Sequence, residues 1–78
     1  MLVKVRLPRL SKSMQEGTIV EWLKNEGDRV AKGDLLYQVE TDKAVTEVEA
    51  PADGVLLSIM KPKGSRVPVN TVVAFIEL

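Results

Sequence analysis

The chain has 78 residues, with no cysteine and no histidine, and its eleven acidic residues balance eleven Lys and Arg residues. The lack of cysteine excludes disulfides and cysteine-based metal sites, and the lack of histidine removes the commonest general base, so we do not expect an independent enzyme. The charges are interspersed and the longest apolar runs are far shorter than a membrane span, so we expect neither a nucleic-acid partner nor a membrane anchor.

Short strands separated by turns account for most of the chain. Apolar and charged residues alternate over residues 3–7, which predicts a half-buried strand ending at Pro8. Further strands are expected, in chain order, over residues 17–24, 35–40, 44–50 and 72–78. Turns are expected at Gly27 and at residues 51–54, and residues 8–15 form the longest expected loop. No segment combines helical spacing with helix caps.

The sequence contains two copies of one unit, related by a shift of 37 residues. The matched pairs are Glu16 with Asp53, Gly17 with Gly54, Lys24 with Lys61, Gly27 with Gly64, Arg29 with Arg66, Val30 with Val67 and Glu40 with Glu77. Two copies are too few for a solenoid. We therefore expect one domain over residues 1–78, with seven or eight short antiparallel strands. Its two sheets would close as a flattened barrel or sandwich about a pseudo-two-fold axis.

Residues 40–44 lie at the junction of the two copies, where a tight β-turn is expected between two strands. The chain ends take the corresponding place in the second copy, so a two-fold arrangement puts this turn and the termini at opposite ends of the molecule. Lys43 lies at the tip between two short residues, Asp42 and Ala44, where a modifying enzyme could reach it. An ordinary solvated lysine is the alternative, and turn chemistry alone does not exclude it.

The sequence resembles the lipoyl domains of the acyltransferase components of 2-oxoacid dehydrogenase complexes, over essentially the whole chain. The matching segments are residues 8–10, 14–22, 26–30, 33–34, 39–44, 49–51 and Gly54. In that family the lysine of the Asp-Lys-Ala turn carries lipoate in amide linkage, so the resemblance implies a covalent lipoyl group on Lys43. The family also has an acidic residue and two glycines at the places of Glu40, Gly27 and Gly54.

The resemblance implies that the domain is not an enzyme by itself but a swinging-arm carrier, which moves acyl groups and reducing equivalents between active sites. The complex would act on pyruvate or a related substrate, acetoin included. The implied partners are the lipoylating enzyme, a thiamine-dependent decarboxylase, the acyltransferase catalytic domain and a flavin-dependent dihydrolipoamide dehydrogenase. The implied location is the cytoplasm, or the mitochondrial matrix of a eukaryote.

Some residues near the lysine have both a recognition and a structural interpretation. Asp42 and Ala44 either present Lys43 or are simply good turn residues. The family counterpart of Glu40 is read by the lipoylating enzyme, although Glu77 shares its place in the repeat and favours a structural part. For Gly27, Gly54 and Gly64, turn formation is the first interpretation and recognition the second, because Gly27 and Gly64 are related by the repeat and only one half has a lysine at its tip.

The loop of residues 8–15 is the candidate for partner specificity, because its family counterpart lies beside the lipoyl turn and helps the decarboxylase to recognise its carrier. An ordinary exposed loop is the alternative. The residues of the loop that are least typical of the family, and that leave the choice of complex open, are Ser11, Lys12 and Ser13.

Three rival interpretations share parts of this pattern. A biotin carrier domain has the same architecture and a lysine at the same hairpin, but methionines flank that lysine, whereas here Asp42 and Ala44 do. An unmodified lipoyl-like interaction module generally lacks the Asp-Lys-Ala tip. A glycine-cleavage carrier also uses lipoate but is longer. A lipoyl carrier is therefore the expected function and a biotin carrier the main alternative.

Overall fold

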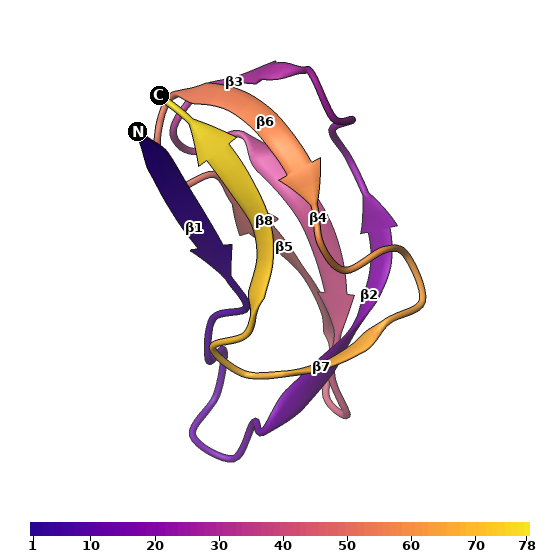
Figure 1. Ribbon diagram of the computed structural model, residues 1–78. Coiled ribbons are helices and arrows are strands. Elements are labelled where there is room, and N and C mark those ends of the chain that lie inside the picture. The colour runs from indigo at the N-terminus through magenta and orange to yellow at the C-terminus, as the bar shows by residue number, and fades with distance from the viewer.

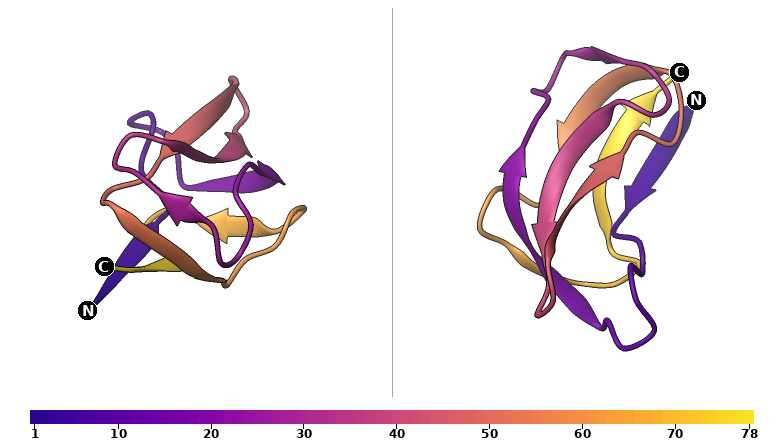
Figure 2. Two further views of the ribbon diagram at one scale, coloured as in Figure 1. Left: turned by 90° about the horizontal axis from the view of Figure 1, so that it is seen from above. Right: turned by 180° about the vertical axis from the view of Figure 1, so that it is seen from behind.

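The computed structural model describes residues 1–78 and contains eight β-strands and no helix (Figure 1). In chain order the strands are β1 (Leu2–Arg6), β2 (Glu16–Trp22), β3 (Arg29–Val30), β4 (Leu35–Glu40), β5 (Val45–Glu49), β6 (Gly54–Ile59), β7 (Arg66–Pro68) and β8 (Val72–Glu77). They pair antiparallel in two four-stranded sheets, ordered β1-β8-β6-β3 and β5-β4-β2-β7. The structure contains no helix that is long and apolar enough to span a membrane. The expected flattened barrel of two facing antiparallel sheets is confirmed (Figure 2).

The strand boundaries differ slightly from those expected. Strand β2 ends at Trp22, two residues early, because the following turn is closed by two hydrogen bonds between Asn25 and Asp28, of 2.7 and 3.0 Å. Strands β3 and β7 have only two and three residues. Such short strands show no alternation, so their pairing with β6 and β2 comes from the fold and not from a local pattern.

The core lies between the two sheets and consists of fifteen buried apolar residues. Nearly all are aliphatic, since the chain has only three aromatic residues, and Tyr37 is the single fully buried one. Its ring lies 4.7 Å from that of Trp22, whose Nε1 donates a hydrogen bond of 2.9 Å to the carbonyl of Lys61. No charged side chain is buried. The core is therefore a structural centre, and the ionisable groups available for function lie on the surface.

The two copies of the repeat make the same contacts, which confirms the pseudo-two-fold arrangement. The N–H of Gly27 donates to the carbonyl of Leu56 at 2.8 Å, and the N–H of Gly64 donates to that of Ile19 at 2.7 Å. Each bond joins one copy to the other at positions related by the repeat. Both glycines have positive φ angles, 93° and 91°, so their expected role as turn formers is confirmed.

Gly17 and Gly54 form a second related pair, but the reason for glycine there is a close approach of strands. A β-carbon on Gly17 would lie 2.6 Å from Cγ2 of Val39, and one on Gly54 would lie 2.8 Å from Cγ2 of Ile76 and in contact with the carbonyl oxygen of Glu77. Gly54 is the first residue of β6. It is therefore required mainly by strand packing, and the expectation that it serves primarily as a turn former is corrected.

The symmetry is broken in the connection between β1 and β2. The N–H of Leu7 donates to the carbonyl of Thr71, and the N–H of Ala50 donates to that of Asp34, so these two bonds are equivalent. Leu7 and Ala50 are 43 positions apart instead of 37, so the connection after β1 is six residues longer than the one after β5. The extra residues all belong to the loop 8–15.

The β4–β5 hairpin and the chain termini lie at opposite ends of the molecule, as expected (Figure 1). The termini adjoin, with the N–H of Leu78 donating to the carbonyl of Met1 at 3.1 Å. The longer β1–β2 connection lies at the hairpin end (Figure 1). The chain connections depart from two-fold symmetry in two places, the closed β4–β5 hairpin and the longer β1–β2 loop. Both therefore lie at the same end of the molecule.

Candidate functional site

The hairpin between β4 and β5 ends in a four-residue turn, Thr41 to Ala44. The strands remain paired up to Glu40 and Val45, and the N–H of Thr41 then donates to the carbonyl of Ala44 at 2.9 Å. The tight turn expected from the sequence is thus present, and it is held directly by the strand ladder. A side chain at its tip projects from a well-defined support rather than from a long loop.

The hydroxyl group of Thr41 also orders the turn. Its Oγ1 accepts N–H groups of Lys43 and Ala44 at 3.3 and 3.4 Å, and it lies 3.3 Å from the carbonyl of Ala44. A Thr side chain that bonds to backbone groups two and three residues later is a recurring turn motif. Thr41 was not predicted as a site residue, although a Thr directly before an Asp-Lys turn is a usable signal.

Lys43 is exposed at the tip, between the exposed Asp42 and Ala44. The structure has two ion pairs, Lys63 with Glu21 at 3.2 Å and Arg66 with Glu16 at 3.1 Å, and neither involves Lys43. Its amine makes no hydrogen bond to a protein group. An enzyme that acylates an amine would therefore meet no competing intramolecular contact at Lys43.

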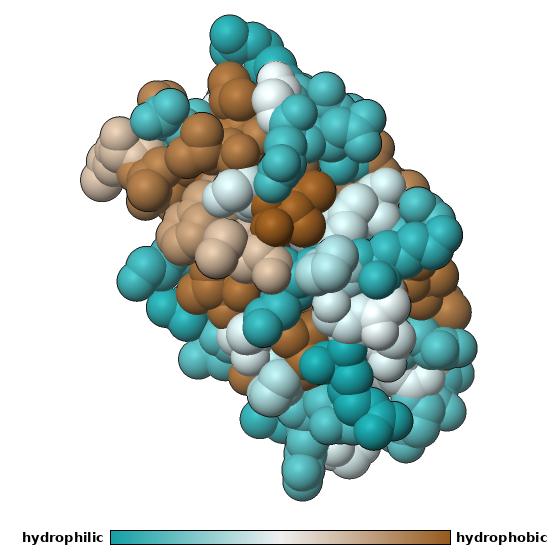
Figure 3. All heavy atoms as spheres, turned by 45° about the vertical axis from the view of Figure 1, so that its right-hand side comes forward, coloured by the Kyte–Doolittle hydropathy of each residue, from teal (hydrophilic) through white to brown (hydrophobic).

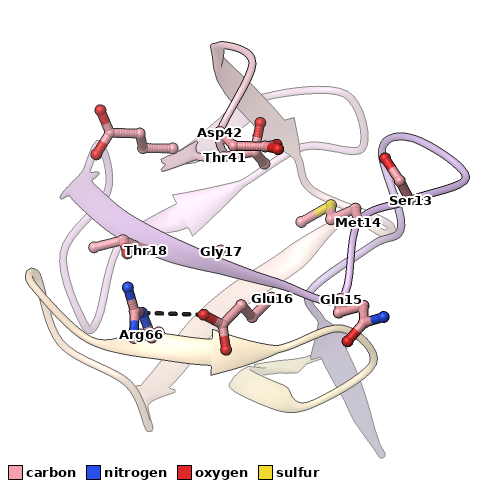
Figure 4. Close-up of a pocket in the computed structure, with 10 residues that line it drawn as sticks. Ser13, Met14, Gln15, Glu16, Gly17, Thr18, Thr41, Asp42 and Arg66 are labelled. Atoms are coloured by element: carbon pink, nitrogen blue, oxygen red, sulfur yellow. Dashed lines mark ion pairs between the residues drawn. The ribbon is translucent and has the colours of Figure 1, made fainter.

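A depression of about 610 Å³ lies beside the hairpin (Figure 4). The hairpin residues on one side are Glu40, Thr41 and Asp42, and the loop residues on the other are Ser13, Met14 and Gln15. Strand β2 contributes Glu16, Gly17 and Thr18, and Arg66 of β7 completes the lining. The loop 8–15 thus lies beside the turn, as the family resemblance implied.

Gly17 belongs to this depression and was not selected as a site residue from the sequence. A β-carbon there would lie 3.3 Å from Cε of Met14 and 3.4 Å from the carbonyl oxygen of Glu40, besides its contact with Val39. Its absence lets the loop, β2 and β4 approach one another under the hairpin. The repeat partner of Gly17, Gly54, was the only signal in the sequence.

The remaining predicted recognition residues are divided between two regions. Glu40 and Ser13 line the depression, while Ser11 and Lys12 lie in the same loop outside its lining. Gly27 bonds instead to the backbone of β6, and Gly54 packs against Glu77 near the C-terminus. The two glycines are therefore not gathered with the hairpin residues.

One face of the hairpin end is largely hydrophilic. On the face shown in Figure 3, hydrophilic residues cover most of the lower end of the molecule, and the larger apolar areas lie above it. The exposed large apolar residues include Met1, Leu2 and Leu78 at the termini, and also Leu10 in the loop 8–15 and Val45 at the start of β5. A partner that approaches the hairpin from this side meets mostly polar groups.

Comparison with known proteins places these features in context. A family model described as biotin-requiring enzyme, Biotin_lipoyl, matches residues 3–76. The dihydrolipoyllysine-residue acetyltransferase component of the pyruvate dehydrogenase complex of Rickettsia conorii is 46% identical over 78 residues, which is 99% of this chain and 19% of that protein. The pyruvate dehydrogenase E1 component subunit beta of Rhizobium meliloti is 47% identical over 75 residues, 95% of this chain and 16% of that protein. The chain thus spans about a fifth of the length of these relatives.

Solved structures show the same fold. The solution structure of the lipoyl domain of the 2-oxoglutarate dehydrogenase complex from Azotobacter vinelandii is similar with a TM-score of 0.79 and 33% identity, and the match covers 97% of this chain and 96% of that one. A single-chain, multi-domain long-chain acyl-CoA carboxylase matches with a TM-score of 0.76 at 20% identity, over 99% of this chain and 7% of that one. At this lower identity the likeness concerns the fold alone.

Proposed function

The chain belongs to the family of biotin- and lipoyl-attachment domains, as a lipoyl domain, and from this premise we propose that Lys43 carries a lipoyl group in amide linkage. One observation carries the proposal. Lys43 lies exposed and unpaired at the tip of the β4–β5 hairpin, whose counterpart in the two-fold arrangement is the pair of chain termini. Residues 1–78, which share one apolar core, would then form a single carrier domain.

The residues present fit such a group. The chain contains no cysteine, so the cyclic disulfide of lipoate would supply the sulfur chemistry, which takes up an acyl group together with two electrons and later releases both. Thr41 fixes the backbone of the turn, and the β4–β5 ladder holds that turn away from the barrel. Acylation would remove the positive charge of Lys43, and no carboxylate would lose an ion pair.

Lipoate is favoured over biotin by the residues around the lysine. Asp42 and Ala44 occupy the places where a biotin carrier has methionines. The names of the relatives support the same choice, since the acetyltransferases that match are named for a dihydrolipoyllysine residue. Biotin remains the alternative to be tested, because the family model covers both groups.

We propose that the domain serves a pyruvate dehydrogenase complex, for which its relatives are named. Its partners would be the lipoylating enzyme, the thiamine-dependent decarboxylase, the acyltransferase catalytic domain and the flavin-dependent dihydrolipoamide dehydrogenase. A tether would keep the group near these sites at an effective concentration on the order of millimolar. Relatives from bacteria and from a mitochondrion support a location in the cytoplasm or the matrix.

The residues predicted to serve recognition would fall into two groups, according to where they lie in the structure. Glu40 and the loop that contains Ser11, Lys12 and Ser13 lie at the hairpin end, where an enzyme that acts on the group must approach. We propose these as the recognition residues. Gly27 and Gly54 would act indirectly, by shaping the barrel that supports this end.

The proposal is tested by the intact mass of the domain after incubation with a lipoate-protein ligase, ATP and lipoic acid. The wild-type domain should gain one lipoyl group, and the Lys43→Ala variant should gain none and unfold at the same urea concentration. Lys32→Ala is the matched control, since it removes an exposed lysine from a turn that contains no proposed recognition residue, and it should be modified fully. Biotinylation by a biotin ligase would favour the alternative, and a folded domain that accepts neither group would contradict the proposal.

A further inference from the structure

Arg9 is exposed, yet its guanidinium group binds two backbone carbonyls of the loop that follows it. Its Nη1 donates to the carbonyl oxygen of Met14 at 2.6 Å and to that of Lys12 at 3.3 Å. Neither of the two ion pairs in the structure involves Arg9. Hydrogen bonds from a charged donor are stronger than neutral ones, so this side chain restrains the loop rather than a neighbouring carboxylate.

The far end of the loop is anchored in the core. Met14 is 4% exposed, and its Sδ accepts the N–H of Leu10 at 3.2 Å. The N–H of Met14 in turn donates to the carbonyl of Ser11 at 3.2 Å. Arg9 therefore ties the exposed part of the loop to a residue whose position the core already fixes, and the two contacts together close the loop on itself.

The loop is not needed to close the barrel. Its repeat counterpart makes the same connection between strands with six fewer residues. What the additional residues form is one wall of the depression beside the hairpin, facing Thr41 and Asp42 (Figure 4). The wall that Arg9 holds is therefore a surface next to Lys43 and not a requirement of the fold.

We propose that Arg9 is a positioning residue for acyl transfer: it holds the loop in the shape that the thiamine-dependent decarboxylase binds when it acylates the group on Lys43. This inference rests on the proposed function. A mobile loop must be ordered on binding, and that entropy cost weakens association. Loss of Arg9 should therefore raise the KM for the domain and leave kcat nearly unchanged, because Arg9 does not reach the reacting atoms.

The test uses lipoylated wild-type domain and the variants Arg9→Gln, Arg9→Lys and Arg6→Gln. Arg6 is the matched control, because its Nη1 also donates to a backbone carbonyl, that of Asn70 at 2.9 Å, but outside the loop. Intact mass establishes that each is fully lipoylated. The assay measures acetylation of the domain by the decarboxylase of a pyruvate dehydrogenase complex. Pyruvate loses carbon dioxide, and the remaining two-carbon unit reduces the disulfide by two electrons. One sulfur then carries the acetyl group and the other a proton.

Arg9→Gln should raise the KM for the domain about three- to tenfold with kcat changed less than about twofold, and should speed amide hydrogen exchange at Met14. Arg9→Lys keeps the charge and one donor group, so its KM should lie between those of the wild type and Arg9→Gln. Arg6→Gln should have the KM of the wild type. An unchanged KM, an unchanged exchange rate, or an equal rise in KM for Arg6→Gln would overturn the inference. A wild-type domain that takes up no lipoate would overturn the proposed function, and this inference with it.

Discussion

The two ends of the molecule are built from the same strand unit but differ in what the chain adds to it. At the terminal end, β1 and β8 are separate strands and the connection after β5 is short. At the hairpin end, the turn that contains Lys43 joins β4 to β5, and the connection after β1 is six residues longer than the one after β5. Contacts that hold the barrel recur at both ends, whereas the residues proposed to serve the carried group occur once. Stability and function are therefore separable by position.

Gly54→Ala tests the shared scaffold and should have the largest effect on stability. The added β-carbon would meet the backbone carbonyl of Glu77, which cannot move without disturbing the pairing of β6 with β8. We expect the free energy of unfolding, measured with urea, to fall by about 3 kcal/mol.

Gly17→Ala is the matched variant at the hairpin end. Its closest contact is a side-chain methyl of Val39, at 2.6 Å, which can adjust more readily than backbone. We expect a smaller loss, roughly 1–2 kcal/mol. A loss at Gly17 equal to or greater than that at Gly54 would contradict the distinction between backbone and side-chain contact.

Thr41→Val tests the hairpin end alone. The variant keeps the shape of the side chain but removes the oxygen that accepts the N–H groups of Lys43 and Ala44. The rate of lipoylation should fall several-fold because the turn is less ordered, while stability falls by about 1 kcal/mol or less. Thr46→Val, on the adjoining strand β5, should leave the rate unchanged. Equal rates for wild type and Thr41→Val would show that the hydroxyl does not present the lysine.

Tyr37→Phe tests an asymmetry of the core that should not matter to function. The Tyr37 hydroxyl is buried without a hydrogen-bond partner, and Ala74 occupies the related position of the second copy. Removing an unsatisfied hydroxyl should change stability at neutral pH by no more than roughly 1 kcal/mol, in the stabilising direction. Lipoylation should proceed at the wild-type rate.

The same variant has a signature at high pH. Burial raises the pKa of Tyr37 above its ordinary value of 10.0, so the unfolded chain loses this proton first. The stability that depends on the neutral phenol is present below about pH 10 and is lost as the pH rises above it. Urea denaturation at about pH 8 and about pH 11 should show a smaller loss for Tyr37→Phe than for the wild type. An identical loss would contradict burial of this hydroxyl.

The sequence predicted the parts of this molecule that depend on local pattern or on the repeat. The turn at Lys43 and the separation of hairpin and termini follow from the shift of 37 residues and from turn residues, whereas the place of the loop 8–15 was implied by the family resemblance. The close approaches at Gly17 and Gly54 could not be predicted, because they depend on distances between strands far apart in the chain. The contacts of Arg9 were missed because an exposed arginine in a loop has no pattern of its own.

The central claim, that the end where the symmetry is broken carries the group, is tested most directly by locating the modification. The domain should be produced in cells that lipoylate their own proteins, digested with a protease, and its peptides sequenced by tandem mass spectrometry. We predict a lipoyl mass on the peptide containing Lys43 and on no other lysine. A lipoyl mass on a different lysine, or an unmodified Lys43 in a folded domain from such cells, would contradict the account.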